Sequence, residues 1–277
     1  MKTALVLEGG AMRGIYTAGI LDAFMEKEVK FDAIIGVSAG ALFGVNYLSE
    51  QKGRAIRYNK KYNSDPNYMG IKPLIKTGNF FDTEYAYEKV PRELDPFDDE
   101  TFKKNAEKIP FYAVLTNMET GKPAYNRIRC AFNQMDELRA SGSMPFVSKP
   151  VELFGKLYLD GGIADSIPFE YMLKKGYDRV VVVLTKSREF VRKPMNKVMV
   201  DLVFKKKYPK FARALRNRHI MYNRQVEKLA ELEKEGKAIV IRPSMELNVG
   251  RSEKNPEKLQ SLYDLGISDA AAFIDKI

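Results

Sequence analysis

The sequence Gly36-Val37-Ser38-Ala39-Gly40 restricts the fold of this chain more than any other segment. The apolar run at residues 31–35 predicts a buried strand, and residues 39–48 have the spacing of small and apolar residues typical of a helix packed on a sheet. A G-x-S-x-G pattern between a strand and a helix is a nucleophile elbow, in which glycines allow a sharp turn because they carry no Cβ. The turn would expose the Ser38 hydroxyl, with a helix N-terminus behind it to favour negative charge.

A second glycine-rich turn, Glu8 to Gly14, also lies between a predicted strand and a predicted helix. Residues 3–7 predict the strand, and apolar residues from Ile15 onward repeat at helical spacing. Backbone N–H groups that converge in such a turn suit either a phosphate or the oxyanion of an acyl-transfer intermediate. The phosphate motifs do not match, because Ile15 stands where a P-loop has lysine and Ala11 stands where a dinucleotide-binding loop has its second glycine. An oxyanion hole is therefore the better interpretation.

A nucleophilic serine needs a base, and the composition narrows the choice. The chain contains 1 His, His219, in a basic and polar segment without an acidic residue nearby in the sequence. A Ser-His-Asp triad requires a histidine whose second ring nitrogen is held by a carboxylate, so we interpret His219 as a surface or capping residue. Asp160 is the better candidate for the base, because it follows the apolar run at 157–159 and precedes Gly161 and Gly162.

The three motifs, in their order and spacing, resemble those of the patatin-like phospholipases. The resemblance covers about residues 3–185, including 116–122 and 140–146, with a weaker similarity at 259–266. It implies a Ser-Asp dyad, with Ser38 as nucleophile and Asp160 as base, that hydrolyses acyl esters of lipids. It also implies an oxyanion hole of backbone N–H groups around Gly10, Ala11 and Met12, with Arg13 at the family's usual basic position. The glycines of the three motifs are Gly9, Gly14, Gly36, Gly40, Gly161 and Gly162.

Two positions depart from the family pattern. Ala11 stands where the family commonly has a third glycine, and its methyl group narrows the approach to the oxyanion but leaves the N–H donor in place. Ser166 stands where the family commonly has asparagine, and its hydroxyl can still hydrogen-bond a loop backbone, although with fewer groups. Neither change removes a catalytic group, so we expect activity.

Predicted strands alternate with predicted helices along the chain. Short apolar runs predict strands at Ala4–Leu7, Ala33–Val37, Phe111–Leu115, Leu157–Leu159, Val180–Leu184 and Ala238–Ile241. This alternation is typical of the α/β class, and we expect a largely parallel central sheet covered by helices on both faces, as the resemblance to patatin-like proteins also implies. Because the chain has no linker rich in Pro, Gly and Ser and no internal repeat, we expect a single domain over residues 1–277.

The composition excludes several classes of site and of protein. The single Cys130 forms no internal disulfide or cysteine metal cluster, and one histidine forms no His-rich metal site, so we expect no metal and no cofactor. The N-terminal apolar run ends at Glu8, which is too short for the hydrophobic region of a signal peptide. No segment approaches the about 18–20 continuous apolar residues of a membrane span. These features predict a cytoplasmic protein.

Positive charge is concentrated in one segment. The formal net charge is +10, and residues 186–224 alone contain 13 basic and 2 acidic residues. Apolar residues at 198–200 and 202–204 lie beside the lysines, and Pro209 precedes a helical pattern from Phe211 to Glu235, so the basic helical segment spans about 186–235. This pattern fits peripheral docking on an anionic membrane, and it fits equally a solvated basic helix that packs its apolar face. Nucleic acid is not an expected partner, because no nucleic-acid-binding motif accompanies the charge.

The segment from Gln51 to Lys108 is rich in aromatic residues and follows the predicted elbow helix. Its aromatic side chains either line an acyl-chain pocket or cover the edge of the sheet, and the sequence favours the second interpretation. Met144 and Phe146 are better candidates for the pocket, because the order of the motifs brings their loop near the dyad.

The function that the sequence predicts is a serine acyl hydrolase, a lipid esterase of the phospholipase A or lysophospholipase type. An acyltransferase would use the same dyad. A binding module of a different class also stays open: an α/β domain that recognises lipid or phosphate, in which residues 9–14 hold an anion and Ser38 has a structural role.

Overall fold

The computed structural model describes residues 1–246 and 248–277. The strands of the described residues are β1 (Thr3–Leu7), β2 (Ala33–Val37), β3 (Phe111–Asn117), β4 (Pro123–Ile128), β5 (Val151–Leu153), β6 (Lys156–Asp160), β7 (Arg179–Val183) and β8 (Ala238–Ile241). All six strands expected from apolar runs are present, with ends shifted by about one or two residues. The sequence analysis did not predict β4 or β5.

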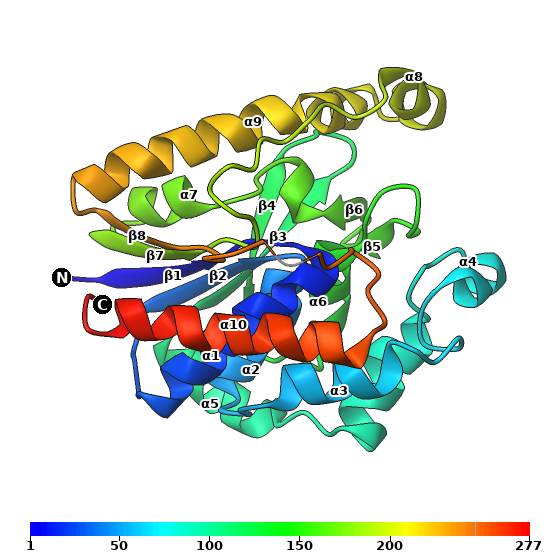
Figure 1. Ribbon diagram of the computed structural model, residues 1–277. Helices are drawn as coiled ribbons and strands as arrows, with labels where there is room; N and C mark the ends of the chain where they lie inside the picture. The colour runs from blue at the N-terminus through cyan, green and yellow to red at the C-terminus, as the bar shows by residue number, and fades with distance from the viewer. Residues whose placement is uncertain (247) are drawn as a thin grey trace.

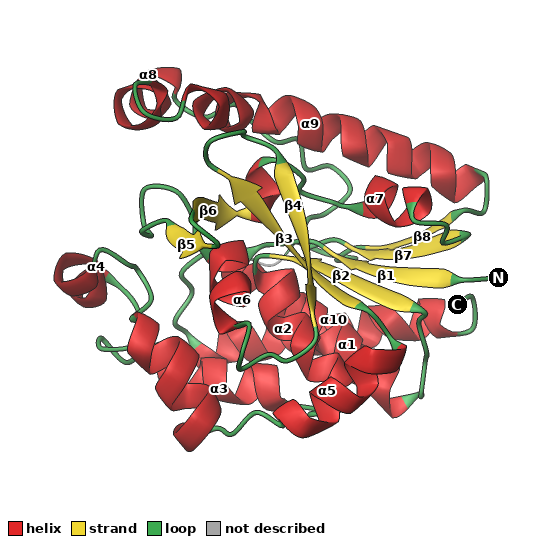
Figure 2. Cartoon of the chain, turned by 180° about the vertical axis from the view of Figure 1, so that it is seen from behind, coloured by secondary structure: helices red, strands yellow, loops and turns green. Residues whose placement is uncertain are grey.

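The strands form one sheet in the order β5-β6-β3-β2-β1-β7-β8, and β4 also pairs with β3. β3, β2, β1, β7 and β8 run parallel, whereas β4 and β6 are antiparallel to β3 and β5 is antiparallel to β6. Helices cover both faces of this sheet (Figures 1 and 2). The prediction of a largely parallel sheet between helical layers is therefore confirmed, with an antiparallel group of strands at one end.

The helices lie in two layers. The α-helices are α1 (Ile15–Glu26), α2 (Ala39–Leu48), α3 (Arg54–Tyr62), α4 (Ile71–Thr77), α5 (Asp99–Lys108), α6 (Met135–Gly142), α7 (Phe169–Lys174), α8 (Lys197–Val200), α9 (Pro209–Lys234) and α10 (Pro256–Ile274). Shorter or wider helical turns are η1 (Ala11–Gly14), η2 (Tyr85–Leu94), η3 (Gly161–Ile163) and η4 (Asp201–Lys205). Helices α1, α2, α5 and α10 lie on one side of the sheet, and α7 and α9 lie on the other (Figure 1).

The central strands are buried on both faces, which explains why they appear in the sequence as continuous apolar runs. In β1, Leu5 and Leu7 belong to the core under α1 and α2, whereas Ala4 and Val6 belong to the core under α7 and α9. The two cores hold the sheet from both sides, so the carboxyl ends of its parallel strands have fixed positions relative to one another.

Helix α10 packs on α1 with backbone in contact with backbone. A Cβ on Gly19 would lie 2.1 Å from the carbonyl oxygen of Tyr263, and one on Gly266 would lie 2.2 Å from that of Tyr16. The Tyr263 hydroxyl also donates a hydrogen bond of 2.6 Å to the carboxylate of Asp22. The C-terminal segment with the weaker family similarity is thus the helix that covers α1.

The basic segment forms α8, η4 and the first half of α9. The helix predicted from Phe211 begins two residues earlier, because Pro209 occupies its first turn, where a missing N–H costs no hydrogen bond. In α8 and η4, Val200 and Phe204 are buried, whereas Val198 and Leu202 are exposed. Among the helices of the described residues, none has both the length and the apolar character needed to cross a membrane.

Candidate active site

Ser38 lies at the turn between β2 and α2. Its backbone has φ of 54° and ψ of −124°, a conformation that residues other than glycine rarely adopt, so the turn is strained. Gly36 and Gly40 leave the space that the turn needs: a Cβ on Gly36 would lie 2.5 Å from the nitrogen of Ala41, and one on Gly40 would lie 2.4 Å from the carbonyl oxygen of Leu7. The strand, sharp turn and helix of a nucleophile elbow are therefore present.

A buried serine on α6 holds this turn in place. The Ser38 N–H donates a hydrogen bond of 2.9 Å to Oγ of Ser141, and that hydroxyl donates one of 2.8 Å to the carbonyl oxygen of Val114 on β3. One side chain thus links the elbow to a helix and to a neighbouring strand. Residues 140–146 were predicted only as part of the family resemblance, and this positioning role was not predicted, because a serine inside a helix carries no pattern of its own.

Strand β3 sets the position of Asp160 relative to Ser38. Val37 pairs with Val114 on β3, and the next β3 residue, Leu115, pairs with Asp160 at the end of β6. Val37, which precedes Ser38, and Asp160 therefore pair with two consecutive residues of β3. Asp160 is buried, and its Oδ1 accepts a hydrogen bond of 2.8 Å from the backbone N–H two residues later.

The loop after Asp160 is closely packed. A Cβ on Gly161 would lie 2.0 Å from a β3 carbonyl oxygen, and one on Gly162 would lie 2.8 Å from Nη2 of Arg218 on α9. The Ser166 hydroxyl donates a hydrogen bond of 2.5 Å to the carbonyl oxygen of Gly162, which is the loop bond expected of the residue that replaces asparagine. Burial lowers the pKa of Arg218 to about 10, although the neighbouring charge of Asp160 acts in the opposite direction.

The Glu8–Gly14 turn lies directly against the elbow. A Cβ on Gly9 would lie 2.8 Å from Cβ of Ser38, and a Cβ on Gly14 would lie 2.8 Å from Cβ of Ala39. Both glycines are therefore needed for close packing of the two turns, which brings the backbone of the first turn next to Ser38.

Some N–H groups of this turn donate to backbone carbonyl oxygens and others do not. The N–H of Met12 donates to the carbonyl oxygen of Arg251 at 3.3 Å, and that of Arg13 donates to the carbonyl oxygen of Gly10 at 3.2 Å. The N–H groups of Gly10 and Ala11 donate to no other residue in the described part of the chain. Ala11 has φ of 50°, in the left-handed region, which accounts for the glycine that the family commonly has there.

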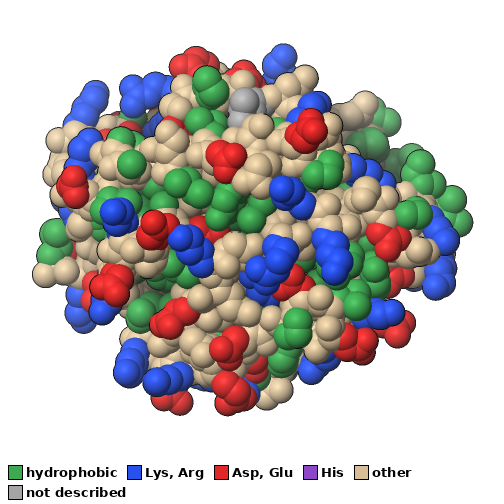
Figure 3. Space-filling view, turned by 60° about the horizontal axis from the view of Figure 1, so that its bottom comes forward, with side chains coloured by type: hydrophobic (Ala, Val, Ile, Leu, Met, Phe, Trp, Pro, Cys, Tyr) green, Lys and Arg blue, Asp and Glu red, His purple; other side chains and the backbone are tan. Residues whose placement is uncertain are grey.

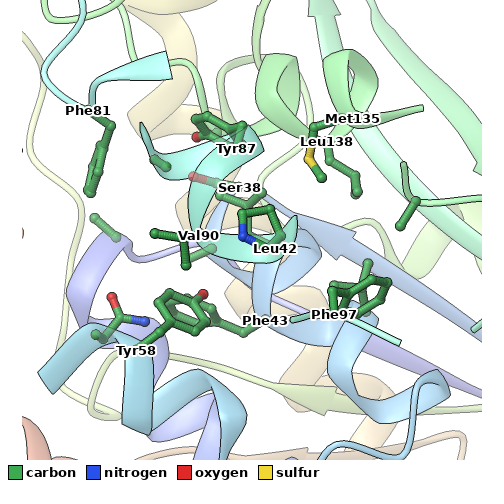
Figure 4. A pocket seen from close by; sticks show the side chains of 18 of the residues that line it. Ser38, Leu42, Phe43, Tyr58, Phe81, Tyr87, Val90, Phe97, Met135 and Leu138 are labelled. Carbon is green, nitrogen blue, oxygen red and sulfur yellow. The ribbon is translucent and has the colours of Figure 1, made fainter. Parts of the chain in front are cut away.

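An apolar cavity of about 110 Å³ lies beside Ser38 (Figure 4). Figure 4 shows Ser38 close to Tyr87 and above Leu42, with Phe43 and Val90 nearby. The lining of the cavity comes from η1, α2, α3, α6, the chain directly after α6 and the chain between α3 and α5. It includes Ala11, Met12, Ala39, Tyr58, Tyr68, Phe81, Phe97, Met135, Leu138 and Met144. A narrow cavity with such walls suits an alkyl chain.

The structure corrects two expectations about this cavity. The aromatic segment at 51–108 supplies much of its wall, whereas the sequence favoured a role as cover for the sheet edge. Burial raises the pKa of one of these residues, Tyr87, to about 12, so its hydroxyl is neutral near pH 7. Met144 lines the cavity as predicted, but the prediction for Phe146 was wrong, because its ring packs against Phe204 at 5.2 Å in a separate apolar cluster.

The single histidine has a local partner. His219 lies in α9, and its Nδ1 is 2.9 Å from the carbonyl oxygen of Arg216, one turn earlier in the same helix. Across residues 1–246 and 248–277, no group of three or more His, Cys, Asp or Glu side chains is arranged to hold a metal ion.

Two family models match most of this chain. A family model described as patatin-like phospholipase matches residues 5–173, and a second, described as a domain of unknown function, matches residues 208–277. The uncharacterized protein YjjU of Escherichia coli is 32% identical over 66% of this chain and 52% of its own length. The probable lipid hydrolase 463L of Invertebrate iridescent virus 6 is 25% identical over 61% of this chain and 63% of its own.

Two further proteins show weaker or partial similarity. Lysophospholipase NTE1 of Cryptococcus neoformans is 28% identical over 66% of this chain but only 11% of its own length. The crystal structure of VipD from Legionella pneumophila matches with a TM-score of 0.48 and 14% identity, over 99% of this chain and 67% of that one. The curated relatives are thus matched over less than two thirds of their length. Since the first family model covers more than half of the sequence, the chain belongs to the patatin-like phospholipase family.

Proposed function

We propose that this protein is a serine acyl hydrolase that cleaves acyl esters of lipids, with Ser38 as nucleophile and Asp160 as base. One observation carries the proposal: the strained elbow that presents Ser38 lies at the wall of an apolar cavity and against a turn with two available N–H groups. These three parts supply a nucleophile, a place for an acyl chain and donors for an oxyanion, which are the elements that ester hydrolysis needs.

The reaction begins with attack of Ser38 Oγ on the ester carbonyl carbon, while the hydroxyl proton passes to Asp160. The carbonyl oxygen becomes an oxyanion, which accepts hydrogen bonds from the N–H groups of Gly10 and Ala11; loss of one such donor typically costs about 2.7–4 kcal/mol. Asp160 returns the proton to the leaving alcohol or lysolipid. Water then attacks the acyl-serine, its proton again passes to Asp160, and the fatty acid leaves as the serine hydroxyl is restored.

Two alternatives share parts of this site. If an alcohol replaces water in the second half of the cycle, the same dyad transfers the acyl group. If Ser38 is only structural, the site binds lipid or phosphate without chemistry. The strained backbone at Ser38 favours catalysis over binding, because a structural serine has no need of such a conformation.

The test is labelling with a fluorescent fluorophosphonate, with the modified residue identified by mass spectrometry. We expect wild type to be labelled at Ser38, Ser38→Ala to be unlabelled and Asp160→Asn to react at least about 100-fold more slowly. Ser261→Ala, which removes an exposed hydroxyl on α10, is the matched control and reacts as wild type. Folded wild type that resists the probe, with anionic vesicles present as well as without them, would refute the hydrolase and favour the binding module.

We also propose that residues 186–224 contact an anionic membrane. The exposed apolar side chains of α8 and η4 support this, since Val198 is 76% and Leu202 84% accessible between lysines on either side. The alternative expectation, a basic helix that packs its apolar face on the protein, describes the other face of the same segment, where Val200 and Phe204 are buried. Basic residues near an anionic surface each contribute about 1 kcal/mol, and an enzyme whose substrate resides in a bilayer benefits from such docking.

A further inference from the structure

Five basic side chains gather beside the proposed dyad without hydrogen-bond partners of their own. None of their side chains donates a hydrogen bond to another described residue, in contrast to Arg54 and Arg57 elsewhere in the chain, which bond Asp95. The five are Arg13, Lys186, Arg192, Arg218 and Arg251, which come from η1, the loops after β7 and β8, and α9.

Burial makes the missing hydrogen bonds of three of these arginines costly, whereas Arg251 lies exposed at the edge of the cluster. The Nε atoms of Arg13, Arg192 and Arg218 are buried and find no partner within the described chain. A buried donor without an acceptor loses its hydration without compensation. Burial, together with the nearby arginines, also lowers the pKa of Lys186 to about 8. The carboxylates near the five are Glu8 and Asp160, together with Glu189 and Glu246 at the surface hollow that Arg192 and Arg251 line, so basic groups outnumber acidic ones in the cluster.

Contacts connect Lys186, Arg192 and Arg251 within the cluster. Nη2 of Arg192 lies 4.0 Å from the carboxylate of Glu8, and its guanidinium carbon lies 4.2 Å from the ring centre of Tyr222. Lys186 and Arg192 both approach the ring of Phe190, at 4.8 and 5.7 Å. Arg192 also lines a surface hollow together with Arg251, whose carbonyl oxygen is bonded to the residue before Arg13.

The cluster adjoins the proposed catalytic groups at two points. Gly9, which packs against Ser38, accepts a hydrogen bond of 3.0 Å at its carbonyl oxygen from the hydroxyl of Thr185, the neighbour of Lys186. The guanidinium of Arg218 lies against Gly162 in the loop after Asp160. None of the five basic side chains lines the apolar cavity, so an acyl chain and a polar head group would meet different surfaces.

We propose that Arg13, Lys186, Arg192, Arg218 and Arg251 form a subsite for a phosphate monoester, so that the preferred substrate is a lipid whose head group ends in that dianion. This inference rests on the proposed hydrolase function and specifies its substrate. Guanidinium groups donate several hydrogen bonds to phosphate oxygens in a fixed planar geometry, which would give the buried Nε atoms their missing acceptors.

The same cluster disfavours zwitterionic head groups. The ammonium of choline or ethanolamine would enter a region where basic groups outnumber carboxylates, and Glu8 is the carboxylate that forms an ion pair with Arg192 there. One oxygen of Glu8 is already engaged, because its Oε2 accepts a hydrogen bond of 2.6 Å from the N–H of Thr185, and its other oxygen is the one that faces Arg192. Two negative charges on a monoester also offset the excess positive charge better than the single charge of a phosphodiester.

The test compares two monomeric substrates, dihexanoylphosphatidic acid and dihexanoylphosphatidylcholine, so that membrane docking plays no part. We expect kcat/KM for the phosphatidic acid to be about tenfold or more above that for the phosphatidylcholine. Arg192→Gln and Arg251→Gln should each bring this ratio toward one. Arg129→Gln, an exposed arginine whose side chain makes no hydrogen bond in the described chain, should leave the ratio as in wild type. A wild-type ratio near one, or an undiminished ratio in both variants, would overturn the subsite.

A second readout separates the sources of the phosphate and does not require catalysis. The melting temperature of the Ser38→Ala protein is measured with dihexanoylphosphatidic acid and with glycerol 3-phosphate. We expect stronger stabilisation by the lipid, lost in Ser38→Ala/Arg192→Gln. Equal stabilisation by glycerol 3-phosphate, with no preference in hydrolysis, would assign the site to a water-soluble phosphate and overturn the lipid assignment. If Ser38 is unreactive and neither ester is cleaved, the hydrolase function fails, whereas this binding readout still decides for or against the phosphate site.

Discussion

Ala11 carries a conformational cost that a single substitution would remove. A left-handed conformation costs an L-residue about 1–2 kcal/mol, and glycine avoids this cost but loses more entropy on folding. We predict that Ala11→Gly raises the free energy of unfolding by about 0.5–1 kcal/mol, measured by denaturant titration. Ala272→Gly is the control of opposite sign, because this exposed residue lies inside α10, where glycine should lower stability by about 1 kcal/mol. A loss of stability in Ala11→Gly would contradict the inference that the backbone of Ala11 is strained.

Lys186 should make phosphate binding depend on pH. The charged groups that act on it are Arg13, Glu8, Arg192 and Arg251, and burial is the largest cause of its low pKa of about 8. Lys186 is therefore charged at pH 7 and loses its charge as the pH rises through 8, while the arginines stay mostly protonated up to pH 9.5, since the pKa of Arg218 is about 10. We predict that the Kd of the Ser38→Ala protein for glycerol 3-phosphate rises several-fold, roughly three- to tenfold, between pH 7 and 9.5.

The control for this pH dependence is Lys186→Arg in the same background. An arginine keeps its charge throughout the range, so the rise in Kd should disappear. The measurement stays above pH 7 because the second proton of a phosphate monoester leaves near pH 6. An equal rise in Kd with arginine at position 186 would assign the pH dependence to another group.

At the scale of elements, the hydroxyl of Ser141 joins α6 to β2 and β3. Ser141→Ala leaves the Ser38 N–H buried without an acceptor, which typically costs about 1–3 kcal/mol. We predict a loss of stability of that size, together with a fall of about tenfold or more in kcat, because the strained elbow loses its support. Thermal unfolding and hydrolysis of a soluble ester measure the two effects. Ser261→Ala removes an exposed hydroxyl that donates to a carbonyl oxygen of its own helix. It should change the free energy of unfolding by no more than about 0.5 kcal/mol and leave kcat as in wild type.

Local patterns predicted the elements that are long, apolar and buried on both faces. The same patterns missed β4, since it begins at Pro123 and its residues are mostly half-buried, and β5, which has 3 residues. Ser38 and Asp160 were proposed as the dyad because each lies at the end of a predicted strand and has glycines beside it. Their pairing through consecutive residues of β3 depends on a register between distant segments, which no local pattern encodes. The basic cluster was not predicted from the sequence, because its members come from four separate segments of the chain.

At the scale of the whole molecule, three protruding segments lie at one end (Figures 1 and 2). They are α4, the β5–β6 turn and the α8–η4 segment. Each exposes large apolar side chains: Ile75 is 81%, Phe154 86% and Leu202 84% accessible. Figure 3 shows hydrophobic and basic side chains together at the end where α4 lies, and Lys72, Lys76, Lys156 and Lys205 are the basic neighbours in the sequence.

Contacts connect the three segments through the chain before β5. The ring of Phe146 packs against Phe204 of η4, and the carbonyl oxygen of Val147 accepts a hydrogen bond of 2.8 Å from Phe80, which follows α4. The N–H of Lys149 donates to the side chain of Asn79 at 2.8 Å. The segments are thus held against one another, so a flat surface that touches one of them is within reach of the others.

This arrangement predicts that docking on an anionic bilayer needs α4 as well as the basic segment. Partial burial of one Ile or Leu side chain contributes about 1 kcal/mol, so the double variant Ile75→Ser/Leu202→Ser should partition about tenfold or more weakly into vesicles of phosphatidylcholine and phosphatidylglycerol. Co-sedimentation measures the partition. Ile267→Ser, an exposed apolar residue on α10, is the matched control and should bind as wild type. If Leu202→Ser alone gives the full loss and Ile75→Ser none, the basic segment docks without α4. A double variant that binds as tightly as wild type would leave these apolar side chains without a part in docking, since electrostatic attraction alone would then account for the binding.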